Sequence, residues 1–348
     1  MIEQALKKRQ VPSFFSGNLE KWQESKSAIL NEILSKEYGF LPKKITPSIK
    51  TEINPINFAG KAKWEIVYFT FENEGKSHTV EANLILPIKE KTDVFLYLSF
   101  ESHVPNKYLP VEEIIDEGFG IFTFGYQDVS YDKNEYESGL CALFSGDYGK
   151  LSLWAYMAHA CTDYLCQRED IGKIAIVGHS RLGKTAILAS ALDDRYVLTC
   201  TNDSGCCGAA LSRGKTKDNE DIETIVNVFP HWFCNDFSAY KGAEENLPFD
   251  QHLLLAQIAP RHLMIGTANE DVWADNEGQF LSAYLASDIW KLYGKKGLVC
   301  KNELPSLGTM LTDGEIGFYQ RQGSHFMSRD DWKIYMAKYK EILNEISK

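Results

Sequence analysis

Strand-like and helix-like segments alternate along most of the chain. Short apolar runs with the composition of buried strands occur at 120–126, 173–177, 196–203, 262–268 and 314–321. Helical periodicity separates these runs and covers 151–166, 182–192, 276–293 and the residues after Ser328. Strands that alternate with helices favour a mainly parallel sheet covered on both faces, so the expected fold class is α/β.

The part of the chain before residue 120 has a different pattern. A helix is expected over residues 19–37, and strand-like runs follow at 63–71, 78–87 and 93–100. These early runs resemble hairpins, which suggests an antiparallel edge on the parallel sheet. We expect a single domain over 1–348, with residues 1–45 as a helical extension that packs on it.

The last helix has a clear amphipathic pattern. Ser328 and Asp331 have the spacing of a capping pair at its start. One apolar stripe runs along it and comprises Trp332, Tyr335, Met336, Tyr339, Ile342 and Leu343. The stripe predicts that this helix packs against the sheet.

Charge and cysteine content limit the class of protein. The formal net charge of −11 argues against a DNA or RNA partner, because binding phosphate needs clustered basic residues. No apolar run approaches the roughly 18 residues of a membrane span, and no signal-peptide pattern follows the basic residues 7–9. We therefore expect a soluble cytoplasmic protein without a membrane partner. The eight cysteines form no C-x-x-C pair, and reduced thiols are expected rather than disulfides or a metal centre.

The stretch GHSRLGKT, residues 178–185, fits two different chemistries. It matches the phosphate-binding P-loop pattern G-x-x-x-x-G-K-S/T, and it also places Ser180 on a sharp turn between a strand and a helix. A P-loop generally follows the first strand of its domain, whereas at least four strand-like runs precede this one. A possible Walker B carboxylate, Asp203, keeps the nucleotide-binding alternative open.

The order of residues after Ser180 favours the nucleophile interpretation. Asp203 and Asp271 each follow a strand-like run, and His325 lies between a strand and the last helix. The order serine, acid, histidine is that of an α/β-hydrolase triad, and all these positions lie at ends of predicted parallel strands, where such sheets bind ligands. Each residue also has a plainer interpretation, because a turn serine, a helix-capping aspartate and a loop histidine are common.

Arg181 follows the nucleophile directly. Its backbone N–H and its guanidinium are candidates for stabilising an oxyanion, although pairing with a carboxylate is an equally good expectation for an arginine. The elbow pattern G-x-S-x-G has glycine where this chain has Leu182, with Gly183 one position later. The turn must therefore be built differently.

At these residues the sequence resembles carbohydrate esterase family 15, the glucuronoyl esterases. Their serine motif G-C-S-R-x-G-K matches GHSRLGK except that His179 replaces cysteine. The resemblance continues through NDSGCCGAALSR (202–213), FPHWFCNDF (229–237), LPFDQHLLLAQIAPR (247–261), EDVWADNEGQF (270–280) and the histidine loop, with a weaker echo at EILSKEYGFLP (32–42).

The resemblance implies an α/β-hydrolase, without metal or cofactor, that cleaves esters between 4-O-methyl-glucuronic acid of xylan and lignin alcohols. It implies Ser180 as the nucleophile, Arg181 as an oxyanion stabiliser and His325 as the general base. Sugar hydroxyls would be bound by Lys184 and Glu223, although Ile222 replaces the glycine of the family's Gly-Glu-Thr segment. Trp273 would line the uronate pocket. The expected partner is a small-molecule or oligosaccharide uronate ester.

The triad acid departs from the family pattern. Many members have glutamate where this chain has Asp203, which is one methylene shorter, and others rely on a carboxylate that matches Asp271. We expect Asp271 to orient the imidazole, since this needs a partner within about 3 Å. The alternatives to a glucuronoyl esterase are a deacetylase of acetylated sugars, an inactive binding relative and a nucleotide-binding protein.

Overall fold

The structure is a computed structural model that describes residues 1–12 and 15–347. The described residues form one ten-stranded sheet in the order β1-β2-β3-β5-β4-β6-β7-β8-β10-β9. Its strands are β1 (Ser48–Asn54), β2 (Ala62–Asn73), β3 (Lys76–Pro87), β4 (Thr92–Ser99), β5 (Gly120–Gly125), β6 (Ile171–His179), β7 (Tyr196–Asn202), β8 (His262–Ala268), β9 (Met310–Leu311) and β10 (Ile316–Arg321).

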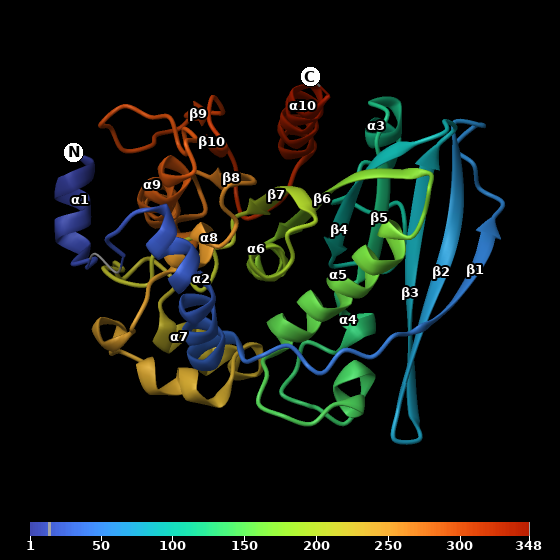
Figure 1. Ribbon diagram of the computed structural model, residues 1–348, viewed down its shortest axis with the longest axis horizontal. Helices are drawn as coiled ribbons and strands as arrows, with labels where there is room; N and C mark the ends of the chain where they lie inside the picture. The colour runs from blue at the N-terminus through green and yellow to red at the C-terminus, as the bar shows by residue number, and fades with distance from the viewer. Residues whose placement is uncertain (13–14, 348) are drawn as a thin grey trace.

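The centre of the sheet is parallel and its edges are antiparallel. Neighbours from β5 through β4, β6, β7 and β8 to β10 pair in parallel. Strands β1, β2 and β3 form an antiparallel ribbon at one end, seen at the right of Figure 1, and β9 is antiparallel at the other. The prediction of an α/β-hydrolase sheet with an antiparallel N-terminal edge is confirmed.

Ten α-helices are assigned in the described residues, and most follow a strand. They are α1 (Ile2–Arg9), α2 (Leu19–Ile33), α3 (Val111–Asp116), α4 (Tyr126–Val129), α5 (Lys150–Cys166), α6 (Arg181–Leu192), α7 (Ile222–Val228), α8 (Gln251–Ala256), α9 (Asn276–Leu292) and α10 (Arg329–Ile346). Short π or 3-10 turns are η1 (Leu34–Tyr38), η2 (Gly139–Leu143), η3 (Pro230–Trp232), η4 (Asn235–Tyr240), η5 (Glu244–Asn246) and η6 (Val272–Ala274). No helix in these described ranges is long and apolar enough to cross a bilayer.

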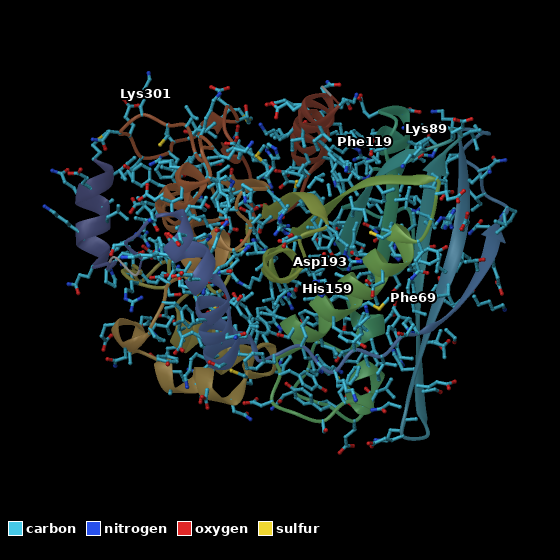
Figure 2. All side chains as sticks on the ribbon, in the orientation of Figure 1. Phe69, Lys89, Phe119, His159, Asp193 and Lys301 are labelled. Atoms are coloured by element: carbon cyan, nitrogen blue, oxygen red, sulfur yellow. The ribbon has the colours of Figure 1, made fainter. Side chains whose placement is uncertain are left out.

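The sheet separates two hydrophobic cores, because alternate side chains of each strand point to opposite faces. In β4, Leu96 and Leu98 join the core formed with α2, α5, α6, α8 and α9, whereas Phe95 and Tyr97 join the one formed with α3 and α10. Figure 2 labels one buried aromatic from each core, Phe69 and Phe119.

Helix α10 packs as its sequence predicts. The Ser328 hydroxyl accepts hydrogen bonds from the backbone of Asp330 and Asp331, and the Asp331 carboxylate accepts in return from the Ser328 backbone. The apolar stripe is buried against the sheet, with Trp332 and Tyr339 fully covered. Capping fixes the start of the helix, and therefore the loop that enters it.

The N-terminal segment joins the larger core through α2 and η1. Trp22 and Tyr38 are fully buried there. Glu37 is fully buried too, and both of its carboxylate oxygens accept from Gln251 Nε2, at 3.0 and 2.8 Å. Burial raises the pKa of Glu37 to about 7, despite the hydrogen bonds that favour its ionised form.

Glu37→Gln is expected to raise the free energy of unfolding above that of wild type, and this increase is expected to be larger at about pH 8 than at about pH 5. The pKa of Glu37 rises from its usual 4.5 to about 7 on folding, so the folded state binds the proton more tightly and stability is lost as pH rises through this range. The full loss is about 3 kcal/mol, and glutamine has no proton to release.

Urea unfolding of both proteins at the two pH values measures this difference. A gap in unfolding free energy between variant and wild type that is the same at both pH values would contradict it.

Candidate active site

Ser180 occupies the sharp turn between β6 and α6, in a backbone conformation that non-glycine residues rarely adopt, with φ 56° and ψ −127°. The turn is so tight that a Cβ added at Gly178 would lie 1.9 Å from the Leu182 carbonyl oxygen. At Gly183 an added Cβ would lie 2.8 Å from Thr201 Oγ1. Leu182 is buried in the core. The elbow therefore uses glycines at 178 and 183 and needs none at 182.

The three predicted triad positions meet at the ends of parallel strands. His325 Nε2 lies 2.8 Å from Ser180 Oγ, and His325 Nδ1 lies 2.6 Å from Asp271 Oδ2. A carboxylate only accepts, so Nδ1 carries the proton and Nε2 accepts from the serine hydroxyl. Asp271 follows β8 and its side chain is 5% exposed, while His325 precedes α10 and is 46% exposed. The arrangement has the geometry of a serine nucleophile activated by a base.

Asp203 is the second carboxylate near the imidazole, but it is bound elsewhere. It is buried after β7, Oδ1 accepts from the Ala268 N–H at 2.8 Å, and Arg321 Nη2 lies 3.6 Å from Oδ2. Burial and the neighbouring Asp271 charge raise the pKa of Asp203 well above its usual value. Asp203 is therefore poorly suited to supply a negative charge to the imidazole, and Asp271 is the carboxylate that contacts it.

These two aspartates and His325 also place three metal-ligand atoms within 4.8 Å of one another. Both imidazole nitrogens, however, already have partners in Ser180 and Asp271. The group therefore fits proton transfer better than metal coordination.

Arg181 pairs with a carboxylate that the sequence analysis did not identify. Its Nη1 donates to Asp132 Oδ2, and its guanidinium carbon lies 4.7 Å from the centre of the Trp232 ring. Phe229 and Phe100 are the next rings, at 5.1 and 5.8 Å. Nothing in the spacing of the sequence indicates this pairing, because Asp132 precedes Arg181 by 49 residues.

Lys184 is buried beside a carboxylate that the sequence did not predict. Lys184 is 3% exposed, and its ammonium donates to the Ser204 and Cys206 carbonyls at 2.6 and 2.5 Å. Its third partner is Glu220 Oε2 at 3.4 Å. Glu223, the carboxylate predicted to bind sugar hydroxyls, lies exposed in the first turn of α7, which begins at Ile222.

Trp273 lies on the loop that also carries Asp271. It belongs to η6 and is 48% exposed, and its carbonyl accepts from the Glu220 N–H at 2.9 Å. This bond brings Glu220 next to the predicted uronate-binding tryptophan. The offset of three residues arises because Glu220 precedes the Asp221 cap of α7 in an irregular segment.

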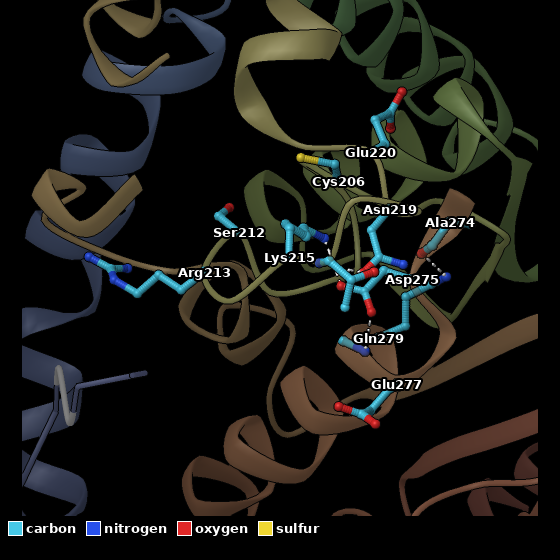
Figure 3. A network of polar contacts seen from close by, with 12 residues as sticks. Cys206, Ser212, Arg213, Lys215, Asn219, Glu220, Ala274, Asp275, Glu277 and Gln279 are labelled. Atoms are coloured by element: carbon cyan, nitrogen blue, oxygen red, sulfur yellow. Dashed lines mark hydrogen bonds and ion pairs between the residues drawn. The ribbon is translucent and has the colours of Figure 1, made fainter. Parts of the chain in front are cut away.

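The end of this loop is fixed by Asp275, shown with Lys215 in the network of Figure 3. Asp275 caps α9 by accepting from the Gly278 N–H at 2.9 Å, and it also accepts from Lys215 Nζ at 2.9 Å. Arg9 of α1 donates to both of its oxygens, at 2.8 and 2.7 Å. Burial opposes ionisation, but Lys215 and Arg9 lower the pKa of Asp275 well below its usual range.

His179, which replaces the cysteine of the family motif, packs against the triad. Its ring centre lies 4.6 Å from that of His325, and its Nδ1 lies 2.8 Å from Asn202 Oδ1. Burial, together with the charge of His325, lowers the pKa of His179 to about 3. A neutral imidazole therefore packs against the imidazole of His325.

The reacting groups lie at an open surface. A cavity of about 750 Å³ lies elsewhere, at the opposite ends of the strands, with a lining that includes His159 and Asp193. The site is therefore located by its side chains and not by cavity size.

Comparison with known proteins identifies the family. A family model described as "Glucuronyl esterase, fungi" matches residues 69–294. The chain belongs to the glucuronyl esterase family. The match contains Ser180, Arg181 and Asp271 but ends before His325.

Individual relatives agree with this family. The chain is 38% identical over 237 residues to "Carbohydrate esterase MZ0003" from an unknown prokaryotic organism, covering 65% of this chain and 54% of that relative. It is 27% identical over 296 residues to a 4-O-methyl-glucuronoyl methylesterase of Schizophyllum commune, covering 79% of this chain and 70% of the relative. The solved glucuronoyl esterase of Solibacter usitatus superposes with a TM-score of 0.83 at 29% identity, covering 94% of each chain.

The P-loop interpretation of GHSRLGKT does not fit the site. β6 is the sixth strand in the chain, and the Lys184 ammonium is buried against carbonyl oxygens. A P-loop lysine projects toward phosphate instead. The family and the triad geometry both favour the esterase chemistry.

Asp271→Asn is expected to lower kcat by about 10⁴-fold, because asparagine leaves the imidazole mis-oriented and its cation without a counter-charge. Asp203→Asn is the matched control. Asp203 accepts from the Ala268 N–H, which an asparagine side-chain oxygen can also do, so kcat is expected to stay within about tenfold of wild type. Steady-state kinetics on one ester substrate measures both, and a reversed ranking would identify Asp203 as the acid.

Proposed function

We propose that this protein is a serine carboxylesterase that hydrolyses a glucuronoyl ester of a hemicellulose-derived carbohydrate. The observation that carries the proposal is the hydrogen-bonded series Ser180–His325–Asp271, with distances of 2.8 and 2.6 Å. The relatives named as glucuronoyl esterases support the class of acyl group.

The reaction proceeds through an acyl-enzyme. His325 Nε2 takes the hydroxyl proton of Ser180 while Oγ attacks the ester carbonyl carbon. The tetrahedral intermediate collapses as His325 returns that proton to the leaving alcohol oxygen. Water, deprotonated by the same nitrogen, then attacks the acyl-enzyme, and His325 returns this proton to Ser180 Oγ as the uronic acid leaves. Asp271 stabilises the imidazolium at both stages, and no metal or cofactor is required.

The oxyanion forms beside the start of α6. The Arg181 backbone N–H belongs to the first turn of this helix, where amides have no intrahelical acceptor. A negative oxygen near this end is stabilised by that donor, by the helix dipole and by the guanidinium of the same residue.

Uronate recognition is assigned to Glu220, Lys184 and Trp273. Trp273 provides an exposed ring for the sugar, and Glu220 provides a carboxylate that accepts from sugar hydroxyls. Lys184 holds Glu220 and the 204–206 carbonyls in place. In this assignment Lys184 acts on the sugar mainly through Glu220.

A cytoplasmic location is part of the proposal. The eight cysteines are free thiols, and six of them are buried. Reduced, buried thiols are typical of proteins in a reducing compartment. In that setting the substrate is a small imported uronate ester and not intact lignin–carbohydrate polymer.

The test compares wild type with Ser180→Ala on methyl glucuronate, benzyl glucuronate and acetylated xylo-oligosaccharides. Wild type is expected to prefer the glucuronate esters, and the variant is expected to lose at least about 10⁴-fold in kcat with an unchanged melting temperature. Faster turnover of the acetylated sugars would make the protein a deacetylase. Full activity in the variant would exclude Ser180 as the nucleophile.

Glu220→Gln tests the uronate site, with Glu223→Gln as its matched control on the same segment. Losing a charged hydrogen bond of roughly 1.5–3 kcal/mol is expected to lower kcat/KM for methyl glucuronate by about 10- to 100-fold. Hydrolysis of a plain aryl acetate is expected to be unchanged, and Glu223→Gln is expected to match wild type on both substrates. Equal losses on both substrates, or a larger effect of Glu223→Gln, would contradict the assignment.

A further inference from the structure

Asp132 is a buried carboxylate that accepts from four donors on three segments, one of which carries Arg181. Its Oδ2 accepts from Arg181 Nη1 and from the Tyr126 hydroxyl, the latter at 3.2 Å. Its Oδ1 accepts from His231 Nε2 at 2.8 Å and from Trp232 Nε1 at 2.7 Å. The side chain of Asp132 is 7% exposed. These four hydrogen bonds therefore fix the position of the Asp132 carboxylate before any substrate binds.

The aromatic side chains around Arg181 add a second restraint. The rings of Phe229 and Trp232 are stacked, with centres 3.9 Å apart and planes 3° from parallel. The guanidinium lies over both of them. Trp232 thus contacts Arg181 through its ring face and Asp132 through its N–H, which connects the two charged groups.

The loop that carries Asp132 is itself anchored. Lys150, the first residue of α5, is fully buried, and its ammonium donates to the Tyr131 and Glu135 carbonyls at 2.5 and 2.6 Å. These acceptors lie on either side of Asp132 in the chain. A buried cation at this place has no role in the ester chemistry, so its contribution is to hold the loop.

The charge of Asp132 is permanent across the working pH range. Burial opposes its ionisation, but the hydrogen bonds from His231, Trp232 and Arg181 outweigh burial and lower the pKa of Asp132 to about 2. Asp132 therefore does not exchange protons with substrate. Its remaining contribution is to fix the direction of the guanidinium.

We propose that Asp132 is a positioning residue that holds the Arg181 guanidinium beside Ser180, so that the positive charge faces the oxyanion as it forms. An arginine side chain has many rotamers, and a group ordered in advance needs no reorganisation in the transition state. This inference rests on the proposed esterase function, because it assigns the role to a step of that reaction.

The test is a double-mutant cycle on benzyl glucuronate with wild type, Asp132→Asn, Arg181→Gln and the double variant. Asp132→Asn is expected to lower kcat by about 10- to 100-fold with KM within about threefold, since the interaction acts on the transition state. In the Arg181→Gln background the same change is expected to alter kcat by less than about threefold. An equal loss of kcat in both backgrounds would show that Asp132 acts independently of Arg181 and would overturn the inference.

Asp193→Asn is the matched structural control. Asp193 is 8% exposed and pairs with Arg195, at the end of the strands opposite Ser180. It is expected to lower the melting temperature while leaving kcat unchanged. If Asp132→Asn behaves in the same way, Asp132 is only structural and the inference fails.

Two further variants keep the outcome clear. If Asp132→Asn does not fold, Asp132→Glu replaces it in the cycle. Asp132→Glu keeps the charge but displaces the carboxylate by one methylene, and the same losses of kcat are expected of it in the two backgrounds. Ser180→Ala separates this inference from the function itself. If Ser180→Ala is inactive and Asp132→Asn retains wild-type kcat, only the positioning role is overturned, whereas an active Ser180→Ala overturns the proposed function.

Discussion

The backbone of Ser180 is the constraint around which the rest of the site is arranged. A left-handed conformation at a non-glycine residue costs roughly 1–3 kcal/mol and persists only where the surroundings enforce it. Here β6 and α6 enforce it from both sides, with the Ser180 N–H bonded to the Asn202 carbonyl at 2.8 Å and the Gly183 N–H bonded to the Ser180 carbonyl at 2.9 Å. Both elements are buried over most of their length, so relaxing the turn would disturb both cores.

Buried cations hold the loops around this turn. Loops expose carbonyl oxygens, and a carbonyl that is buried needs a donor. Lys150 serves the 131–135 loop, Lys184 serves 204–206, and Arg213 donates to the Leu247 and Phe249 carbonyls at 2.5 and 2.8 Å. Although the chain has a net charge of −11, these cations therefore lie inside the protein, where they donate hydrogen bonds to backbone carbonyl oxygens. The irregular segments at the carboxyl ends of the strands gain the rigidity that positioning of reacting atoms requires.

The parts of the structure that were predictable from sequence are those that depend on local pattern. Periodicity located the central strands and α10, and the order Ser180, Asp271, His325 located the groups that meet. The contact of Glu220 with Lys184 was not predicted, because Glu220 lies in an irregular segment, where spacing gives no side-chain direction. The raised pKa of Asp203 depends on burial and on the charge of Asp271, and the Asp132 contact spans 49 residues. Both are properties of the packed chain, for which one sequence carries no local signal.

The contact between Arg9 and Asp275 has a consequence for the order of assembly. Its partners are 266 residues apart, and Asp275 ends the loop that carries Asp271 and Trp273. During synthesis α1 leaves the ribosome long before its carboxylate partner exists, so the buried guanidinium has to remain solvated until β8 and α9 are made. A nascent chain stopped just before residue 275 would contain the Ser180 elbow and the Asp271 loop but would lack both the Asp275 that braces this loop and His325. The esterase site is thus completed by a late, long-range closure, and unfinished chains would carry the nucleophile without catalytic power.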